Sequence, residues 1–216
     1  MISQLILPIE LGSRMTRDDF IVAPGNQHAL AFLDAWPDWP APAVALYGPS
    51  ASGKTHLARI WAVRANATVT DAHDLSGLIA GPAVVENCDS ESNHVNEPAL
   101  FAMLERGTPL LLTGHGAPAT WPVGLPDLAS RFRALLAFQL GSADEALLMA
   151  LAVKLFADRQ VQVPEVVVTE LVQQLERSPV AIRDFIAKAD REAMSRQKPI
   201  NLQLIRGLMA EPSVSS

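Results

Sequence analysis

Cysteine and basic residues are both scarce in this sequence. One cysteine, Cys88, occurs among 216 residues, so the chain cannot form an internal disulfide, as is typical of proteins in the reducing cytoplasm. Lys and Arg number 17 against 23 Asp and Glu, which gives a net charge of −6. A general nucleic-acid binder normally carries a basic surface. We therefore expect a cytoplasmic protein that does not bind nucleic acid directly.

Long hydrophobic runs are absent as well. No run of about 18 uncharged apolar residues occurs, which is the minimum for a membrane-spanning helix, so we expect no membrane association. Met1 to Gly12 lacks the basic start and the cleavage site of a signal peptide. Apolar residues still make up 49% of the chain and charged residues 19%. This balance is typical of a folded domain, and the length suits one core with a small appendage.

Short apolar runs alternate with helical stretches up to Gly141. Ala43 to Tyr47 is a continuous apolar run that ends at a glycine, which is the pattern of a strand buried on both faces of a parallel sheet. We expect a first helix over 27–36, capped by Asn26. The other expected strands cover 67–70, 83–85, 110–113 and 135–138, with helices over 54–65, 74–79 and 98–106 between them. This alternation predicts an α/β fold with a five-stranded parallel sheet.

The pattern changes to helices alone after Gly141. The expected helices cover 143–160, 164–175, 180–195 and 201–209, and only residues 166–168 are ambiguous between helix and strand. We interpret this region as a helical lid. The predicted division of the chain is a peptide over 1–10, an α/β core over 11–141, the lid over 142–210 and a tail over 211–216.

Residues 48–55 carry the clearest chemical signal. They read Gly-Pro-Ser-Ala-Ser-Gly-Lys-Thr and match the P-loop pattern G-x-x-x-x-G-K-[ST] at every fixed position. In such a loop successive backbone N–H groups wrap a phosphate, the lysine reaches the β- and γ-phosphates, and the threonine hydroxyl binds Mg²⁺. The predicted ligand is ADP or ATP with Mg²⁺. Its expected contacts here are Gly48, Ser50, Ser52, Gly53, Lys54, Thr55 and His56.

A second element of the phosphate site is expected at the end of an apolar strand. Glu86 follows 83–85 and is the favoured Mg²⁺ ligand, through a water molecule, together with Thr55. Asn87 occupies the next position, where many P-loop ATPases have a carboxylate, and an amide cannot accept a proton from the attacking water. We therefore expect weak intrinsic ATPase activity at most. Asp89 remains an alternative to Glu86.

With these features in this order, the sequence resembles the DnaA branch of AAA+ proteins and, more closely, the Hda/HdaA family of regulatory inactivators of the replication initiator DnaA. The resemblance covers nearly the whole chain. Five segments carry it: Gln-Leu-Ile-Leu-Pro-Ile at 4–9, Asp-Phe-Ile-Val-Ala-Pro-Gly-Asn at 19–26, the P-loop, Leu-Leu-Leu-Thr-Gly-His at 110–115 and Leu-Ala-Ser-Arg-Phe at 128–132. It implies a P-loop AAA+ core with a C-terminal helical lid.

The resemblance also assigns roles to residues outside the P-loop. It implies that Phe20 and Ile21 line the adenine pocket, that Thr113 is a sensor of the γ-phosphate, and that Arg183 reaches phosphate from the lid, with Arg177 as the alternative. Arg131 would be an arginine finger supplied to a neighbouring protein, with Arg133 as a spare, whereas His115 has no expected role. The clamp-binding peptide would use Gln4, Leu5, Leu7, Pro8 and Ile9, since extended peptides bind by placing alternate side chains in pockets.

The function implied by this resemblance is regulation of chromosomal replication initiation. The chain would bind the DNA sliding clamp and stimulate hydrolysis of ATP bound to DnaA. Because the sequence ends soon after the lid, we expect no DNA-binding domain of the initiator type. Two alternatives stay open: an independent ATP-consuming P-loop enzyme, such as a kinase or a helicase-loader ATPase, and a scaffold that needs no nucleotide. The sequence also leaves self-association open.

Overall fold

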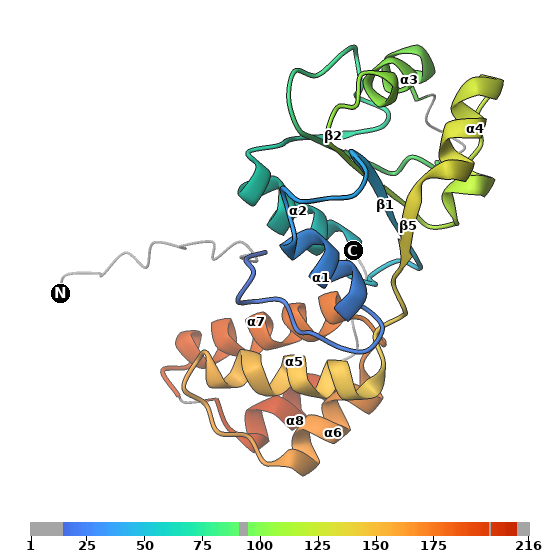
Figure 1. The fold of residues 1–216 in the computed structure, drawn as a ribbon. Coiled ribbons are helices and arrows are strands. Elements are labelled where there is room, and N and C mark those ends of the chain that lie inside the picture. The colour runs from blue at the N-terminus through green and yellow to red at the C-terminus, as the bar shows by residue number, and fades with distance from the viewer. Residues whose placement is uncertain (1–14, 91–94, 199, 211–216) are drawn as a thin grey trace.

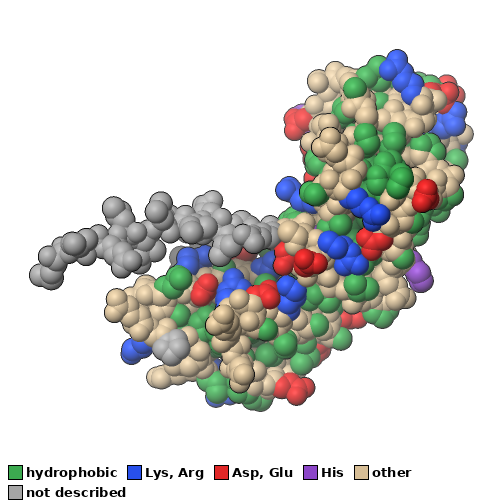
Figure 2. All heavy atoms as spheres, turned by 60° about the vertical axis from the view of Figure 1, so that its left-hand side comes forward, with side chains coloured by type: hydrophobic (Ala, Val, Ile, Leu, Met, Phe, Trp, Pro, Cys, Tyr) green, Lys and Arg blue, Asp and Glu red, His purple; other side chains and the backbone are tan. Residues whose placement is uncertain are grey.

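A computed structural model of the protein describes residues 15–90, 95–198 and 200–210. The chain forms an α/β body, which lies at the top of Figure 1, and a helical body below it. In Figure 2 the two bodies meet at a concave step where Lys and Arg side chains gather, with Asp and Glu among them. The predicted clamp-binding residues Gln4, Leu5, Leu7, Pro8 and Ile9 and the predicted tail lie outside the described residues.

A five-stranded parallel sheet forms the centre of the α/β body, which confirms the predicted fold class. The strand order is β2-β3-β4-β1-β5. The strands are β1 (Ala43–Tyr47), β2 (Thr68–Asp71), β3 (Ala83–Glu86), β4 (Leu110–Gly114) and β5 (Leu136–Gln139). The strand β1 therefore lies between β4 and β5, and its carboxyl end opens directly into the P-loop.

Helices cover both faces of the sheet (Figure 1). Because side chains alternate along a strand, Val44 and Leu46 of β1 pack under α1 (Gln27–Asp34) and α2 (Lys54–Ala65). Ala43 and Ala45 face α3 (Glu97–Glu105) and α4 (Pro126–Ala134). A short 3₁₀ helix, η1 (Pro118–Thr120), precedes α4. Burial on both faces explains why these strands are continuous apolar runs.

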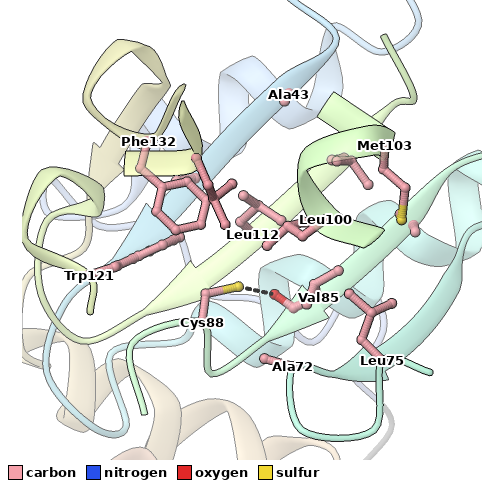
Figure 3. Close-up of a cluster of buried hydrophobic side chains, with 14 of the residues drawn as sticks. Ala43, Ala72, Leu75, Val85, Cys88, Leu100, Met103, Leu112, Trp121 and Phe132 are labelled. Carbon is pink, nitrogen blue, oxygen red and sulfur yellow. Dashed lines mark hydrogen bonds between the residues drawn. The ribbon is translucent and has the colours of Figure 1, made fainter. Parts of the chain in front are cut away.

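Figure 3 shows the core beneath α3 and α4. The rings of Trp121 and Phe132 pack edge to face, 5.0 Å apart. Cys88 lies in the same core and its thiol donates a hydrogen bond to Val85 O at 3.4 Å. Burial raises the pKa of this thiol. Cys88 is therefore a packing residue that stays protonated.

The helical body has a hydrophobic core of its own. Its helices are α5 (Glu145–Ala157), α6 (Glu165–Gln174), α7 (Pro179–Ser195) and α8 (Leu202–Ala210). Asp144 and Ser178 cap α5 and α7, because their side chains accept hydrogen bonds from the N–H groups of Leu147 and Ala181. The ambiguous residues 166–168 belong to α6, where Val168 and Leu171 are spaced so that both enter the core. Among the described residues, no helix is long and apolar enough to cross a membrane.

Local details differ from the sequence-based expectations. Residues 74–79 form turns and irregular chain, not a helix, and only Leu75 is buried there, with Ile79 partly buried against the same core. The helix α4 was not among the expected helices, although proline suits the first position of a helix. Asn26 occupies the N-cap position of α1, but its side chain makes no capping bond. That helix ends at Asp34, before Pro37, because a residue preceding proline avoids helical angles.

Candidate phosphate-binding cleft

The P-loop joins β1 to α2, which is the strand–loop–helix context that the motif needs. Two of its backbone positions require glycine. Gly53 precedes α2 with φ +97°, and Gly48 leaves β1 with φ +152°. A Cβ on Gly48 would also lie well under 3.0 Å from Leu140 O. The glycines therefore make the loop conformation possible, and Gly48 lets the Leu140 backbone lie close to the loop.

Lys54 lies across the loop. Its ammonium group donates hydrogen bonds to Gly48 O and Pro49 O, each at 2.8 Å. Burial lowers the pKa of Lys54, and the carboxylate of Asp89 opposes that shift. Ser52, two residues before Lys54, is 7% exposed, and its hydroxyl has no hydrogen-bond partner among the described residues. A buried, unpaired hydroxyl beside a lysine and the start of a helix fits a phosphate oxygen.

A cleft of about 340 Å³ lies beside the loop. It is bounded by the segment before α1, by the P-loop with the start of α2, and by the helices α5 and α7 of the helical body. Its lining residues are Met15, Asp19, Phe20, Ile21, Asn26, Ala51, Ser52, Gly53, Lys54, Thr55, His56, Leu147, Leu151, Pro179, Val180 and Arg183. Of the predicted nucleotide-binding residues, Gly48 and Ser50 are the two that do not line it. Both lie in the adjoining loop.

Phe20 and Ile21 form the apolar end of the cleft, and they connect the two bodies. Phe20 packs in the core under α1 and α2, whereas Ile21 packs against the core of the helical body. The Asn26 side chain holds this segment, since it accepts from Ala23 N at 2.9 Å and donates to Ile21 O at 3.0 Å. An apolar wall set by backbone geometry suits the flat face of a base.

His56 lies beneath Phe20, with the two rings packed edge to face at 5.1 Å. Its Nε2 is 2.9 Å from Thr16 O, which makes Nε2 the protonated nitrogen of the neutral ring. Burial lowers the pKa of His56; the Thr16 carbonyl opposes this shift and Arg183 adds to it. The structure therefore presents a neutral His56 that donates to the backbone.

The helical body contributes Arg183, near the start of α7. Arg183 makes no hydrogen bond or ion pair within the described part of the chain, and burial lowers its pKa, opposed by Asp19. Asp19 itself accepts hydrogen bonds from Thr16 and from Lys154. Burial alone would raise the pKa of Asp19, but these bonds lower it overall. Arg177, the alternative to Arg183, is exposed and does not line the cleft.

Glu86 ends β3, Asn87 and Asp89 follow it, and all three lie outside the cleft lining. The Glu86 Oε1 atom is buried without a hydrogen-bond partner among the described residues. Asn87 turns the chain with φ +59°, and its amide donates to Asp71 at 2.6 Å. A carboxylate oxygen and the hydroxyl of Thr55 are oxygen ligands of the kind that Mg²⁺ takes. These residues fit a Mg²⁺ site in chemistry, and the choice between Glu86 and Asp89 stays a prediction.

Thr113, the predicted sensor, lies near the end of β4 and is 2% exposed. Its hydroxyl accepts a hydrogen bond from Asn87 N at 3.3 Å. His115, two residues later, faces the P-loop, with Nε2 3.3 Å from the Ser50 hydroxyl. The structure thus places His115 against the loop, and the role of Thr113 as a sensor stays a prediction.

Arg131 lies on α4, away from the cleft, where it pairs with Glu105 of α3. Both side chains are about half exposed. Arg133, the spare, is also exposed. The structure therefore does not bring Arg131 to the chain's own P-loop.

Asp19 and the apolar residues Leu147 and Leu151 are cleft residues that sequence reasoning missed. Leu147 and Leu151 belong to α5, which begins far along the chain. Nothing in the apolar spacing of that helix separates a cleft-facing leucine from a core leucine. The Ser-Pro pair at 178–179, which starts α7, was a readable signal for the helix that brings Arg183 to the cleft.

Comparisons with known proteins identify the fold. No protein-family model matches the sequence, and no curated protein matches it either. Domain III of the Thermotoga maritima replication initiation protein DnaA is similar in structure, with a TM-score of 0.73 and 18% identity over 90% of this chain and 95% of that one. AMPPCP-bound DnaA from Aquifex aeolicus has a TM-score of 0.69 and 16% identity over 87% of this chain and 71% of that chain.

The Thermotoga maritima RuvB Holliday junction branch migration motor is also similar, with a TM-score of 0.70 and 18% identity over 90% of this chain and 71% of that chain. DnaA and RuvB are AAA+ proteins. At these identities the likeness concerns the fold and does not reach a particular family within it. The chain therefore has the AAA+ fold, with a five-stranded parallel sheet and a C-terminal group of helices.

Proposed function

We propose that this chain binds ADP or ATP in the cleft beside the P-loop. The supporting observation is the convergence on one cleft of a complete P-loop with the buried Ser52 hydroxyl and the Arg183 guanidinium, neither of which has a hydrogen-bond partner among the described residues. The AMPPCP-bound DnaA structure of the same fold adds to this support. In this proposal the division into a core over 11–141 and a lid over 142–210 places the nucleotide between the two parts.

Each part of the cleft has a distinct task in this proposal. Backbone N–H groups of the loop and Lys54 hold the phosphates, and Thr55 with Glu86 holds Mg²⁺, which would neutralise phosphate charge. Phe20 and Ile21 take the adenine face. Arg183 replaces water at a phosphate oxygen, so nucleotide binding draws α7 toward the P-loop.

We further propose that the protein regulates replication initiation by stimulating ATP hydrolysis on DnaA. Arg131 is half exposed on α4 and lies away from its own cleft, which suits a guanidinium offered to a neighbouring ATP site. Such fingers contribute about 10³ to 10⁵ in rate. The peptide Gln4, Leu5, Leu7, Pro8 and Ile9 would tether the protein to the sliding clamp. Its own hydrolysis is expected to be weak, because Asn87 offers no carboxylate.

Calorimetry with ADP and ATP tests the first step. We expect binding by the wild-type protein and loss of more than tenfold in affinity in Lys54→Ala, since a phosphate-binding cation is removed. A wild-type protein with no affinity for either nucleotide would leave the scaffold alternative. Substantial turnover by the isolated protein, lost in Lys54→Ala, would favour the independent ATPase.

The second step needs DnaA bound to ATP and DNA-loaded clamp. Addition of the wild-type protein should speed hydrolysis, and Arg131→Ala should remove the effect while ADP affinity stays within about twofold. Arg133→Ala, which removes the spare arginine from the same helix, shows which of the two arginines carries the effect. The double variant Gln4→Ala/Leu7→Ala tests the clamp tether in a pull-down.

A further inference from the structure

The strand β5 forms one edge of the sheet. Within the described part of the chain it pairs with β1 alone. Leu140 N donates to Tyr47 O at 2.7 Å, and Tyr47 is paired with Gln139 in the register of the two strands. Because backbone groups alternate in direction along a strand, the N–H and C=O groups of Ala137 and Gln139 point away from β1. The free edge of β5 therefore presents backbone groups that a further strand can pair with.

This edge lacks the usual protection against pairing with another chain. Edge strands commonly carry a charged residue, a proline or a bulge for that purpose. The strand β5 is short, but its sequence, Leu-Ala-Phe-Gln, contains no charge and no proline, and Leu136 is 38% exposed. At the opposite edge of the sheet, β2 ends in the acidic residue Asp71. The composition of β5 thus favours a strand that meets a partner.

Charges of opposite sign flank the two ends of β5. The strand runs from α4 toward the helical body (Figure 1), with Arg133 shortly before it and Glu145 shortly after it. Both residues are exposed, and neither makes an ion pair among the described residues. An antiparallel neighbour with the same sequence places its Glu145 at the Arg133 end and its Arg133 at the Glu145 end. The charges therefore complement a second copy of this chain in the antiparallel direction.

A hollow of about 380 Å³ lies where the start of α1 meets the carboxyl end of β5. Its lining includes His28 of α1, Phe138 of β5 and Gly141. Leu136 and Phe138 lie on the same face of the sheet, since side chains alternate along a strand. A two-fold axis normal to the sheet reverses the direction of a strand and keeps its faces. Such an axis beside β5 directs the exposed Leu136 of each copy toward the hollow of the other.

We propose that this chain forms a two-fold dimer through β5, in which the β5 strands of two copies pair antiparallel and join the two sheets into one. Ala137 of each copy exchanges backbone hydrogen bonds with Gln139 of the other, and Phe138 lies at the axis. Each contact occurs twice, because a two-fold interface uses the same surface of both copies. The paired strands are short, so the dimer is weak and depends on protein concentration. This proposal does not rest on the nucleotide site.

Sedimentation velocity of the full chain across the micromolar range tests the proposal. We expect a dimer fraction that rises with concentration in the wild-type protein. Ala137→Pro should weaken the dimer by about tenfold or more, because proline removes an N–H group that points to the free edge and leaves the pairing with β1 intact. Leu136→Ala should weaken it by about tenfold, the usual effect of truncating an apolar anchor. Val63→Ala is the matched control, since Val63 is an apolar residue of α2 that is 84% exposed.

Charge reversal provides a second measurement that leaves the strand itself unchanged. Arg133→Glu and Glu145→Arg should each weaken the dimer by about tenfold, because symmetry repeats each altered exposed pair. The double variant Arg133→Glu/Glu145→Arg should return to within about threefold of the wild-type dissociation constant, since it restores both pairs with their signs exchanged. Arg191→Glu is the control, because it makes the same change of charge at an exposed arginine of α7.

A wild-type protein that stays monomeric throughout this range would overturn the proposal. A dimer that is unchanged in both Ala137→Pro and Leu136→Ala would also overturn it, because its interface would then lie elsewhere. Thermal unfolding shows whether Ala137→Pro is folded. If that variant does not fold, the charge-reversal series decides, and a double variant no stronger than either single variant would contradict antiparallel pairing of β5.

Discussion

Lys154 on α5 donates a hydrogen bond to Asp19 at 3.3 Å, which joins the helical body to the segment before α1 across 135 positions of sequence. Both side chains are about one-third exposed. Asp19 also lines the cleft, as does Arg183 of α7. The electrostatic connection between the two bodies therefore runs along the wall of the proposed nucleotide site.

The first prediction concerns this pair. Asp19→Asn should lower the free energy of unfolding by about 0.5 to 1 kcal/mol, because a partly solvated ion pair contributes no more than that. The loss should shrink in about 1 M salt, where charges are screened. Urea unfolding at low and high salt measures it. Asp158→Asn is the control, since it removes only the ion pair between Lys154 and the C-cap residue of α5. A salt-independent loss in Asp19→Asn would contradict the ionic origin.

The second prediction concerns pH and His56. Its pKa is lowered in the folded protein, first by burial, so the unfolded chain binds a proton more readily. The stabilisation that the neutral His56 gives the folded protein is complete above the pKa of the unfolded chain, about 6.5. It is lost as the pH falls from there through the pKa of His56 in the folded protein. The free energy of unfolding should therefore decrease from pH 7 to pH 5. In His56→Gln that decrease should be smaller, whereas His73→Ala should keep the wild-type slope; identical slopes in His56→Gln and wild type would refute the assignment.

The third prediction concerns the start of the P-loop. Gly48→Ala should destabilise the protein by about 1 to 3 kcal/mol, the usual cost of overpacking, because the new Cβ meets the Leu140 carbonyl and alanine resists the φ of +152°. Thermal unfolding measures the loss. Gly77→Ala is the control, since a Cβ there meets nothing within 4 Å. Similar melting temperatures for the two variants would show that the backbone at Gly48 relaxes freely.

Sequence patterns predicted best where one physical cause dominates. The run from Ala43 to Tyr47 is apolar because both faces of β1 are covered, and the following loop is recognisable because the P-loop pattern fixes its glycines and its lysine. The P-loop therefore lies at a strand–helix junction, as predicted. In the same way the change from alternating elements to helices after Gly141 marks the separate core of the helical body.

Sequence patterns failed where contacts between distant parts of the chain determine the structure. Asp19 gives no local sign of its contact with Lys154, and Ser50 gives none of its contact with His115, 65 positions away. Residues 74–79 include Ser76 and Gly77, which disfavour a helix interior, and only Leu75 among them is buried. Thr113 stays the predicted sensor, and its contact with Asn87 N, 26 positions away, also has no local sign in the sequence.

The fourth prediction follows from the contact between Arg131 and Glu105. If Arg131 enters a neighbouring ATP site, it must first leave the Glu105 carboxylate, so this ion pair competes with the proposed function. Glu105→Ala should therefore raise the stimulation of DnaA-bound ATP hydrolysis by about two- to fivefold. An exposed ion pair contributes up to about 1 kcal/mol, and breaking it in advance lowers the free energy needed to release Arg131 by that amount. Stability should change by less than about 0.5 kcal/mol, because both side chains are half exposed.

Phosphate release from DnaA bound to ATP, with DNA-loaded clamp present, measures this effect. Asp127→Ala is the matched control, since it removes an exposed acid from α4 that makes no ion pair among the described residues. The double variant Glu105→Ala/Arg131→Ala should be as inactive as Arg131→Ala, because Glu105 acts only by holding that arginine. Enhanced stimulation in the double variant would mean that Glu105 affects the partner by another route, and unchanged stimulation in Glu105→Ala would mean that the pair does not restrain the finger.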